Sequence, residues 1–257
     1  MRTTLITGGL GFIGSSICET LLQKKYTDKC VLVDNFGGYM NPIKDGFIDF
    51  RKQRFPSLKN IIIERCDTSN YKALSSIIKK YKPNYIYHTA ALPLAKVSNL
   101  NNEEAKISSV DSTVNIIDAI HLLKNSNKKY KFDRFVYFSS SMVYGDFKRS
   151  TVTEQSEKNP KDAYGIMKLA GEVVTEGLCK LHNISYTIVR PSAVYGPKDM
   201  NRRVSQIFIE NAFKKKEISI QGKNEKLDFT YIKDLANGSI LAARSKKGIN
   251  EIFNITC

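Results

Sequence analysis

Short apolar runs alternate with amphipathic stretches along most of the chain. The runs contain no charged residues and are rich in β-branched and aromatic side chains, which is typical of strands buried on both faces of a parallel sheet. Such strands are expected at residues 5–7, 31–33, 61–63, 85–87, 135–138 and 185–189. Between them, apolar residues at helical spacing predict helices at residues 15–25, 73–80, 103–123 and 163–181.

This alternation predicts an α/β fold. Right-handed crossovers would place helices on both faces of the sheet, which gives a doubly wound parallel sheet, or Rossmann fold. After Arg190 the pattern becomes less regular, and a helix at residues 206–214 and a strand at residues 218–220 are expected there.

A glycine-rich turn follows the first expected strand directly. Gly8, Gly11 and Gly14 lie three residues apart and lead into the first expected helix. Residues without a Cβ let the backbone turn tightly and approach a pyrophosphate at a helix N-terminus. The strand–turn–helix setting favours a dinucleotide loop, with Phe12 and Ile13 in contact with the cofactor, over a glycine turn that binds nothing.

The second expected strand ends at Asp34, about twenty residues after the loop, where an acidic residue can bind an adenosine ribose diol. Its carboxylate would repel a 2′-phosphate, and Asn35 follows where a binder of that phosphate would favour Arg or Lys. We therefore expect NAD rather than NADP. The alternative is that Asp34 only caps a turn.

Three serines, residues 139–141, follow the fifth expected strand, at the sheet edge where such folds bind ligands. Further along, Tyr164 and Lys168 are four residues apart, so the phenol and the ammonium share one helical face. The ammonium, together with an oxidised nicotinamide ring, would favour the phenolate and make Tyr164 an acid–base catalyst. A tyrosine and a surface lysine without a catalytic role are the alternative for this spacing alone, but the glycine loop and the serines favour catalysis.

These motifs, in this order, resemble the NAD-dependent epimerase/dehydratase family of extended short-chain dehydrogenases. The resemblance extends over nearly the whole chain. It is carried by residues 8–14, Asp34, residues 66–67, 88–91 and 139–145, Tyr164 with Lys168, and residues 190–197 and 228–234.

The resemblance implies roles for further residues. It places Ser140 at the position of the catalytic hydroxyl, beside Tyr164 and Lys168. The cofactor-binding residues that it implies are Asp67 and Thr68 near the adenine, Ala90 and Ala91 along the cofactor, and Pro191 and Val194 near the nicotinamide. It also implies a homodimer, formed through the helices around Val110 and Val173.

The resemblance further implies an epimerase that acts on a nucleotide-activated sugar. Dehydratases of the family have Asp-Glu directly after the catalytic hydroxyl, whereas Ser141 and Met142, which would contact the substrate here, cannot act as carboxylic acids or bases. A 4-epimerase needs only the tyrosine, the serine and NAD. A reductase of a 4-keto sugar and a non-catalytic NAD-binding scaffold remain alternatives.

Several phosphate-binding positions differ from the family pattern. Ala193 and Leu227 stand where an asparagine and an arginine are usual, and Ser109 replaces an active-site asparagine. Arg202 and Arg203 are candidate substrate-binding residues, since a guanidinium matches phosphate oxygens. The alternative is that both arginines are simply solvated.

The expected domains follow from these motifs. Residues 1–189 would form the NAD-binding domain that carries the catalytic residues. Residues 190–257 would form a small, incomplete C-terminal substrate-binding region, interleaved with the first domain, because members of the family continue beyond the corresponding point.

The chain has 40 lysine and arginine residues against 25 aspartate and glutamate residues, a net charge of +15. The lysines are scattered or in short runs without interleaved aromatic residues, so a surface that favours solubility is preferred to nucleic-acid binding. A weak attraction for an anionic cofactor or substrate is compatible with this.

Five widely spaced cysteines without a C-x-x-C motif predict neither a disulfide framework nor a metal site, and favour a reducing compartment. The apolar runs are too short to span a bilayer, and the N-terminus lacks the pattern of a signal peptide. We therefore expect a cytoplasmic protein without a membrane partner.

Overall fold

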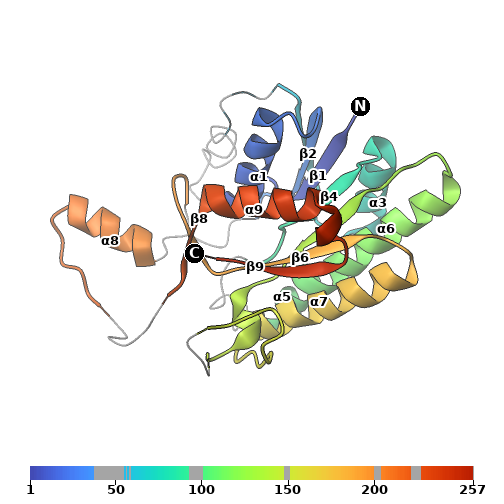
Figure 1. Cartoon of the computed structure of the whole chain (residues 1–257). Helices are drawn as coiled ribbons and strands as arrows, with labels where there is room; N and C mark the ends of the chain where they lie inside the picture. Colours follow the sequence, from blue (N-terminus) through green and yellow to red (C-terminus); the bar gives the residue numbers. More distant parts are fainter. Residues whose placement is uncertain are drawn as a thin grey trace.

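A seven-stranded parallel sheet forms the centre of the protein (Figure 1). The computed structural model describes residues 1–37, 55, 57, 59–92, 101–147, 151–199, 204–220 and 227–256. The strands lie in the order β3-β2-β1-β4-β5-β6-β9. Their bounds are β1 Thr3–Thr7, β2 Lys29–Asp34, β3 Ile61–Arg65, β4 Tyr85–His88, β5 Arg134–Phe138, β6 Tyr186–Pro191 and β9 Glu251–Ile255.

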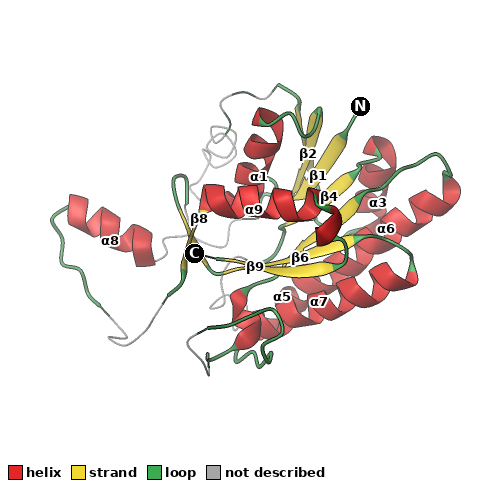
Figure 2. Cartoon of the chain, in the orientation of Figure 1, coloured by secondary structure: helices red, strands yellow, loops and turns green. Residues whose placement is uncertain are grey.

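Helices cover both faces of this sheet (Figure 2). On one face, α1 (Phe12–Gln23) packs against α9 (Ile232–Arg244). On the other face, α6 (Ser112–Ser126) lies between α3 (Tyr71–Tyr81) and α7 (Ala163–Leu181). One buried apolar cluster lies under each layer, so the predicted doubly wound sheet is confirmed.

The expected helix at residues 103–123 is interrupted. It consists of α5 (Asn102–Lys106), a π-helical turn η1 (Ile107–Asp111) and then α6. The turn holds Ser109, which is buried beside α7. Spacing alone could not reveal this, because a π turn shifts the helical register without changing which residue types are apolar.

The C-terminal third departs most from the sequence prediction. The prediction of a strand at residues 218–220 is wrong, since these residues are exposed and lie outside any strand. The strands present instead are β7 (Ala193–Tyr195) and β8 (Phe229–Tyr231), which pair in parallel, and β9, which joins the main sheet beside β6. The expected helix at residues 206–214 is α8 (Val204–Phe213), which buries none of its residues and stands apart from the sheet in Figure 1.

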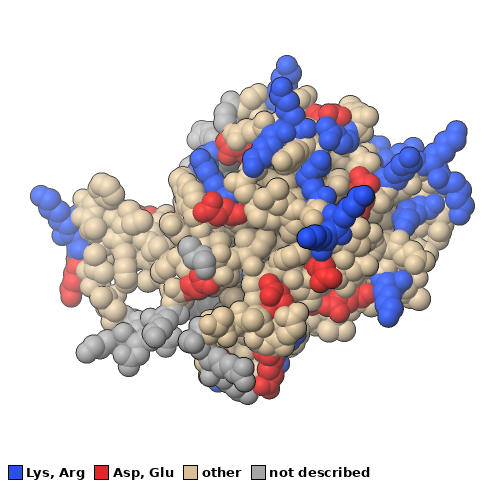
Figure 3. All heavy atoms as spheres, in the orientation of Figure 1, with Lys and Arg blue, Asp and Glu red and all other residues tan. Residues whose placement is uncertain are grey.

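Many positive charges gather at the amino edge of the sheet, where the strands begin and the helices end. They cover much of the upper and right-hand part of the view in Figure 3. The cationic side chains placed there by the element bounds are Arg2, Lys24, Lys25, Lys29, Lys59, Lys79, Lys80, Lys82, Lys128, Lys129, Lys131, Lys180, Lys246 and Lys247. Cations near helix C-termini complement the helix dipole. These cationic side chains therefore lie opposite the sheet edge that carries the glycine loop.

Cys18, Cys30, Cys66 and Cys179 are buried free thiols. Within the described ranges, no group of three or more histidine, cysteine or acidic side chains is placed to hold a metal ion. No helix in those ranges has both the length and the apolar character needed to cross a membrane.

Candidate active site

The glycine loop joins β1 to α1 at the carboxyl edge of the sheet. Gly8 has a φ of +63°, in the left-handed region that favours glycine. A Cβ at Gly8 would meet the backbone nitrogen of Ala90 at 2.8 Å, and a Cβ at Gly14 would clash with the carbonyl oxygen of Gly8. The loop can therefore lie against both β4 and α1 only because these residues have no side chain.

The backbone N–H groups at the N-terminus of α1 have no side-chain cap among the described residues. Gly11 is the N-cap, and the first turn of the helix contains no acidic residue. The N–H groups at the start of a helix and the positive end of its dipole attract anions. Phe12 and Ile13 begin this helix, so loop and helix together fit the pyrophosphate of a dinucleotide.

Asp34 ends β2 next to the loop and is 8% exposed. One carboxylate oxygen accepts a hydrogen bond from the backbone nitrogen of Leu10 at 3.1 Å, and the other accepts from Phe36 at 2.9 Å. The turn-capping interpretation therefore holds in part, because Asp34 fixes the loop. Each carboxylate oxygen can accept a second hydrogen bond, so these contacts are compatible with binding of a ribose diol. That role of Asp34 stays a prediction.

Asn35 and Asp67 lie together although 32 residues separate them. The Asn35 side chain donates to a carboxylate oxygen of Asp67 at 2.9 Å. Burial would raise the pKa of Asp67, but hydrogen bonds from Asn35 and Ser69 together lower it. The neighbouring Thr68 is buried, and its carbonyl oxygen accepts from Asn115 at 3.0 Å. These predicted cofactor-binding residues thus form one hydrogen-bonded, anionic cluster after β2 and β3.

Lys168 is the most deeply placed of the predicted catalytic residues, with 3% of its surface exposed. Its ammonium donates to the carbonyl oxygen of Phe138 at 2.7 Å and lies 5.8 Å from the centre of the Tyr164 ring. Burial lowers the pKa of Lys168 to about 8, and the carboxylate of Glu172 opposes this shift. The cation next to the phenol is therefore shielded from water.

Tyr164 stands in the first turn of α7, close to the serines. The Asp162 side chain caps this helix by accepting from the backbone nitrogen of Gly165 at 2.7 Å. A Cβ at Gly165 would meet the carbonyl oxygen of Met142 at 2.6 Å, so the start of α7 packs tightly against the 3-10 helix η2 (Ser141–Tyr144). Ser140 is the N-cap of η2, which brings it near the helix turn that carries Tyr164.

The hydroxyl oxygen of Ser140 accepts from the backbone nitrogen of Met142 at 3.2 Å, a bond that does not use its hydrogen. Ser141 donates to the Ser192 hydroxyl at 3.3 Å, which joins η2 to the segment between Pro191 and Val194. Met142 is 42% exposed. The predicted nicotinamide-side and substrate-side residues therefore share one region at the end of β5 and β6.

His88 was not predicted as a functional residue, yet it lies at the centre of this edge. Its Nδ1 lies 2.7 Å from the Thr7 hydroxyl and its Nε2 lies 3.1 Å from that of Ser112. Because the Ser112 hydroxyl donates to the Ser108 carbonyl oxygen, it accepts from Nε2, and Nδ1 accepts from Thr7. Burial lowers the pKa of His88 to about 3, so the ring is neutral and joins β1, β4 and α6.

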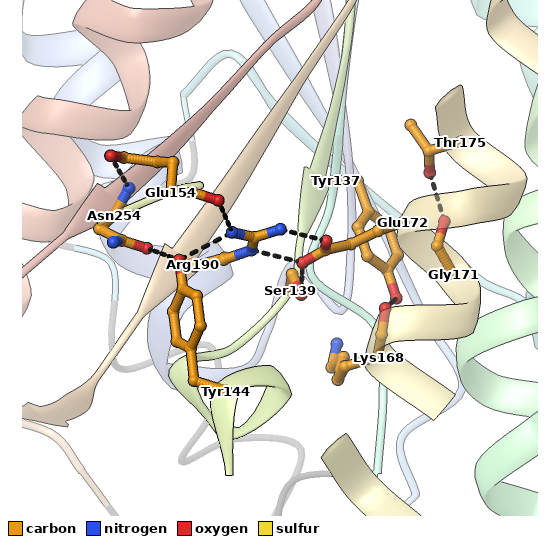
Figure 4. A network of polar contacts seen from close by, with 10 residues as sticks. All are labelled: Tyr137, Ser139, Tyr144, Glu154, Lys168, Gly171, Glu172, Thr175, Arg190 and Asn254. Atoms are coloured by element: carbon orange, nitrogen blue, oxygen red, sulfur yellow. Dashed lines mark hydrogen bonds and ion pairs between the residues drawn. The ribbon is translucent and has the colours of Figure 1, made fainter. Parts of the chain in front are cut away.

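A buried ion pair was also missed. Arg190, near the end of β6, is fully buried, and its Nε and Nη2 donate to the two carboxylate oxygens of Glu172 at 2.8 and 2.6 Å. Figure 4 shows Arg190 between Glu172 and Tyr144, with Ser139 beside the carboxylate. The sequence did contain one signal for Glu172. It follows Lys168 by four residues, and this spacing places the two side chains on one helical face.

Comparison with known proteins places the chain in a family. A family model described as the NAD-dependent epimerase/dehydratase family matches residues 4–256. The chain belongs to the NAD-dependent epimerase/dehydratase family. This confirms the predicted family, the enzyme class and NAD as the cofactor.

The relatives of this family member include more than one kind of enzyme. A protein of Methanocaldococcus jannaschii, named as a candidate UDP-glucose 4-epimerase, is 30% identical over 98% of this chain and 75% of its own length. The dTDP-D-glucose 4,6-dehydratase of Dictyostelium discoideum is 27% identical over 99% of this chain and 58% of its own. A crystal structure of the UDP-glucuronic acid 4-epimerase of Bacillus cereus, in complex with UDP-glucuronic acid and NAD, has a TM-score of 0.85 at 28% identity, covering 99% of this chain and 77% of that one.

Two predicted substrate residues of this epimerase-family protein, Arg202 and Arg203, lie outside the described residues. Of the positions that differ from the family pattern, Ala193 begins β7 and Leu227 is 54% exposed, directly before β8. The roles of Ser140, Tyr164 and Lys168, and those of the cofactor-binding residues, stay predictions that the arrangement supports.

Proposed function

We propose that this protein interconverts the C4 epimers of a nucleotide-activated sugar. One observation carries the proposal: a buried lysine ammonium next to Tyr164, at the sheet edge that holds the glycine loop. The similarity to the M. jannaschii and B. cereus proteins, which are named as 4-epimerases, supports this activity, and the family indicates NAD as the cofactor.

The chemistry follows from the side chains. Bound NAD supplies a hydride acceptor, and after reduction a hydride donor, for the C4 carbon. The phenolate of Tyr164, stabilised by the Lys168 ammonium, takes the proton of the C4 hydroxyl. The Ser140 hydroxyl donates a hydrogen bond to the same substrate oxygen. After the ketone has turned its other face to the nicotinamide, Tyr164 returns the proton to the oxygen, and no net oxidation remains.

Elimination of water lacks a suitable acid or base in η2. Ser141 and Met142 follow Ser140, and neither can act as a carboxylic acid or carboxylate. The next acidic residue along the chain is Asp146, which is exposed beyond η2. This favours epimerisation over the reaction of the dehydratase relative. A reductase of a 4-keto sugar would use the same three side chains and is the second candidate.

The purified protein should be incubated with UDP-, GDP- and dTDP-sugars without added cofactor, and the products followed by NMR. Formation of a C4 epimer with tightly bound NAD supports the proposal. Stoichiometric consumption of NADH or NADPH would instead identify a reductase. Tyr164→Phe should abolish turnover, whereas Tyr71→Phe, a change at an exposed tyrosine of α3, should not. Turnover that persists in Tyr164→Phe would refute the catalytic assignment.

A further inference from the structure

We propose that Glu172 and Arg190 are positioning residues, whose buried ion pair fixes the segment that carries Ser140 and sets the charge environment of Lys168. The inference rests on the proposed function, because it concerns the same catalytic side chains. The pair contacts Ser139 and Tyr144 directly, on either side of Ser140, so both residues act on the catalytic side chains through their neighbours.

The ion pair holds both ends of the segment that contains Ser140. On one side, the Ser139 hydroxyl donates to a carboxylate oxygen of Glu172. On the other side, Nη1 of Arg190 donates to the Tyr144 hydroxyl at 2.7 Å. Ser140 lies between these two contacts, at the start of η2. One guanidinium–carboxylate pair therefore limits how far the catalytic hydroxyl can move.

The Arg190 end of the pair is itself anchored at the outer part of the sheet. Nη1 also donates to the carbonyl oxygen of Glu154 at 3.1 Å, and the Tyr144 hydroxyl donates to the Asn254 side chain at 2.7 Å. The backbone nitrogen of Asn254, in β9, donates to the Glu154 carboxylate at 2.7 Å (Figure 4). The segment that follows Ser140 is thus tied to β6, β9 and the loop before α7.

Glu172 also faces Lys168. It lies one helical turn further along α7, and it is the carboxylate whose charge opposes the effect of burial on the Lys168 ammonium. The other groups around this ammonium are the Phe138 carbonyl and the Tyr137 and Tyr164 rings. His88, on β4, is neutral because burial lowers its pKa to about 3. Among these described neighbours, Glu172 alone is anionic.

A purely structural role does not account for this arrangement well. Desolvation of two charges offsets most of the attraction in a buried ion pair, so apolar residues of similar size often give equal stability. The pair does fix the relative positions of its two groups, because a guanidinium and a carboxylate can form two parallel hydrogen bonds only in a narrow range of geometries. We therefore expect its loss to affect catalysis more than folding.

The first test measures the charge effect without activity. In the NAD-bound protein, the side-chain NMR resonances of Lys168, assigned by their loss in Lys168→Met, should titrate about one pH unit lower in Glu172→Gln than in the wild type. Glu176→Gln, which removes the same charge one turn further along α7, should shift them much less. An unchanged titration in Glu172→Gln would overturn the charge role.

The second test measures positioning. Ser139→Ala and Tyr144→Phe each remove one link to the ion pair but keep the pair itself. Together they should lower kcat at least about tenfold, as the loss of residues that orient catalytic groups does, while KM and the Kd for NAD change less than about threefold. An unchanged kcat in the double variant would overturn the positioning role.

The third test separates catalysis from folding. If Glu172→Gln alone fails to fold, Glu172→Gln with Arg190→Met removes the unpaired charge and should restore the melting temperature but not kcat. Recovery of both would mean that the pair acts only on stability. If the wild type converts no sugar, the proposed function fails, yet the titration of Lys168 still decides the charge role of Glu172.

Discussion

The ammonium nitrogen of Lys168 lies 2.7 Å from the carbonyl oxygen of Phe138, at the point where β5 ends. This contact ties α7 to the central sheet and holds the ammonium 5.8 Å from the centre of the Tyr164 ring. A cation in such a place loses most of its hydration, and a single carbonyl replaces it only in part. We therefore expect an apolar residue at this position to make the protein more stable.

Lys168→Met should stabilise the protein at pH 7 and abolish turnover. Burial lowers the pKa of Lys168 from 10.5 to about 8, so the folded state binds fewer protons than the unfolded state between these values. Burial of the charged ammonium therefore lowers the free energy of unfolding by about 3 kcal/mol at any pH below 8. In Lys168→Met, loss of the hydrogen bond to Phe138 reduces the expected gain in stability by about 1 kcal/mol. Urea denaturation at pH 7 should show the gain, and the gain should shrink as the pH rises from 8 to 10.5.

Lys79→Met serves as the control, because Lys79 is exposed at the end of α3. It should show no comparable gain at pH 7. A Lys168→Met variant that is less stable than the wild type at every pH would mean that the ammonium contributes more to folding than its burial costs.

The sequence predicted the central sheet because its strands are apolar on both faces and alternate with segments of helical spacing. The first six strands and the intervening helices carry this pattern. β9 was missed because Glu251 and Asn254 interrupt its apolar residues, although Ile252 and Phe253 pair with β6. β7 and β8 were missed because each has only three residues, too few to show any period.

The candidate site was predictable where the chemistry depends on local spacing. Tyr164 and Lys168 share a helical face, and Gly8 to Gly14 form one continuous stretch that runs from the turn after β1 into the first turn of α1. The contacts of Arg190 with Glu172 and of His88 with Thr7 join residues 18 and 81 positions apart. Such pairings depend on the three-dimensional arrangement, which a single sequence does not encode in any periodic pattern.

Gly14→Ala should weaken NAD binding and destabilise the protein. The added Cβ would clash with the carbonyl oxygen of Gly8 and would lie 2.9 Å from the Cα of Gly9, so the loop would have to move away from α1. Gly177→Ala is the matched control, because a Cβ at that helical position meets nothing within 4 Å. It should stabilise α7 by about 0.5–1 kcal/mol, since alanine favours helices over glycine.

Calorimetric titration with NAD and thermal denaturation would compare these two variants. We expect the Kd for NAD to rise at least about tenfold in Gly14→Ala, a loss of about 1.4 kcal/mol, and to stay unchanged in Gly177→Ala. Equal NAD affinities in the two variants would place the cofactor away from the glycine loop.

Asp34→Ser combined with Asn35→Arg should shift the cofactor preference from NAD toward NADP. The change removes the carboxylate that would repel a 2′-phosphate and adds a guanidinium that can bind it. It also removes the Asn35–Asp67 hydrogen bond and the acceptor for Leu10, so we expect weaker binding of NAD. The ratio of the two Kd values, measured by calorimetry, tests this.

Asp28→Ser is a control for the loss of an acidic residue, since Asp28 lies at the amino edge of the sheet before β2. It should leave the ratio of the two Kd values as in the wild type. A wild-type protein that already binds NADP as tightly as NAD would contradict the role assigned to Asp34.

His88→Gln should make stability less sensitive to acid. Burial lowers the pKa of His88 from 6.5 to about 3, so its neutral form is favoured in the folded state. The resulting stability is complete above pH 6.5 and is lost as the pH falls toward 3, at up to about 1.4 kcal/mol per pH unit. Glutamine keeps one donor and one acceptor but does not titrate. Urea denaturation between pH 6.5 and 4 should therefore show a flatter decline in stability for His88→Gln than for the wild type. Equal slopes would mean that burial does not hold His88 neutral in the folded state.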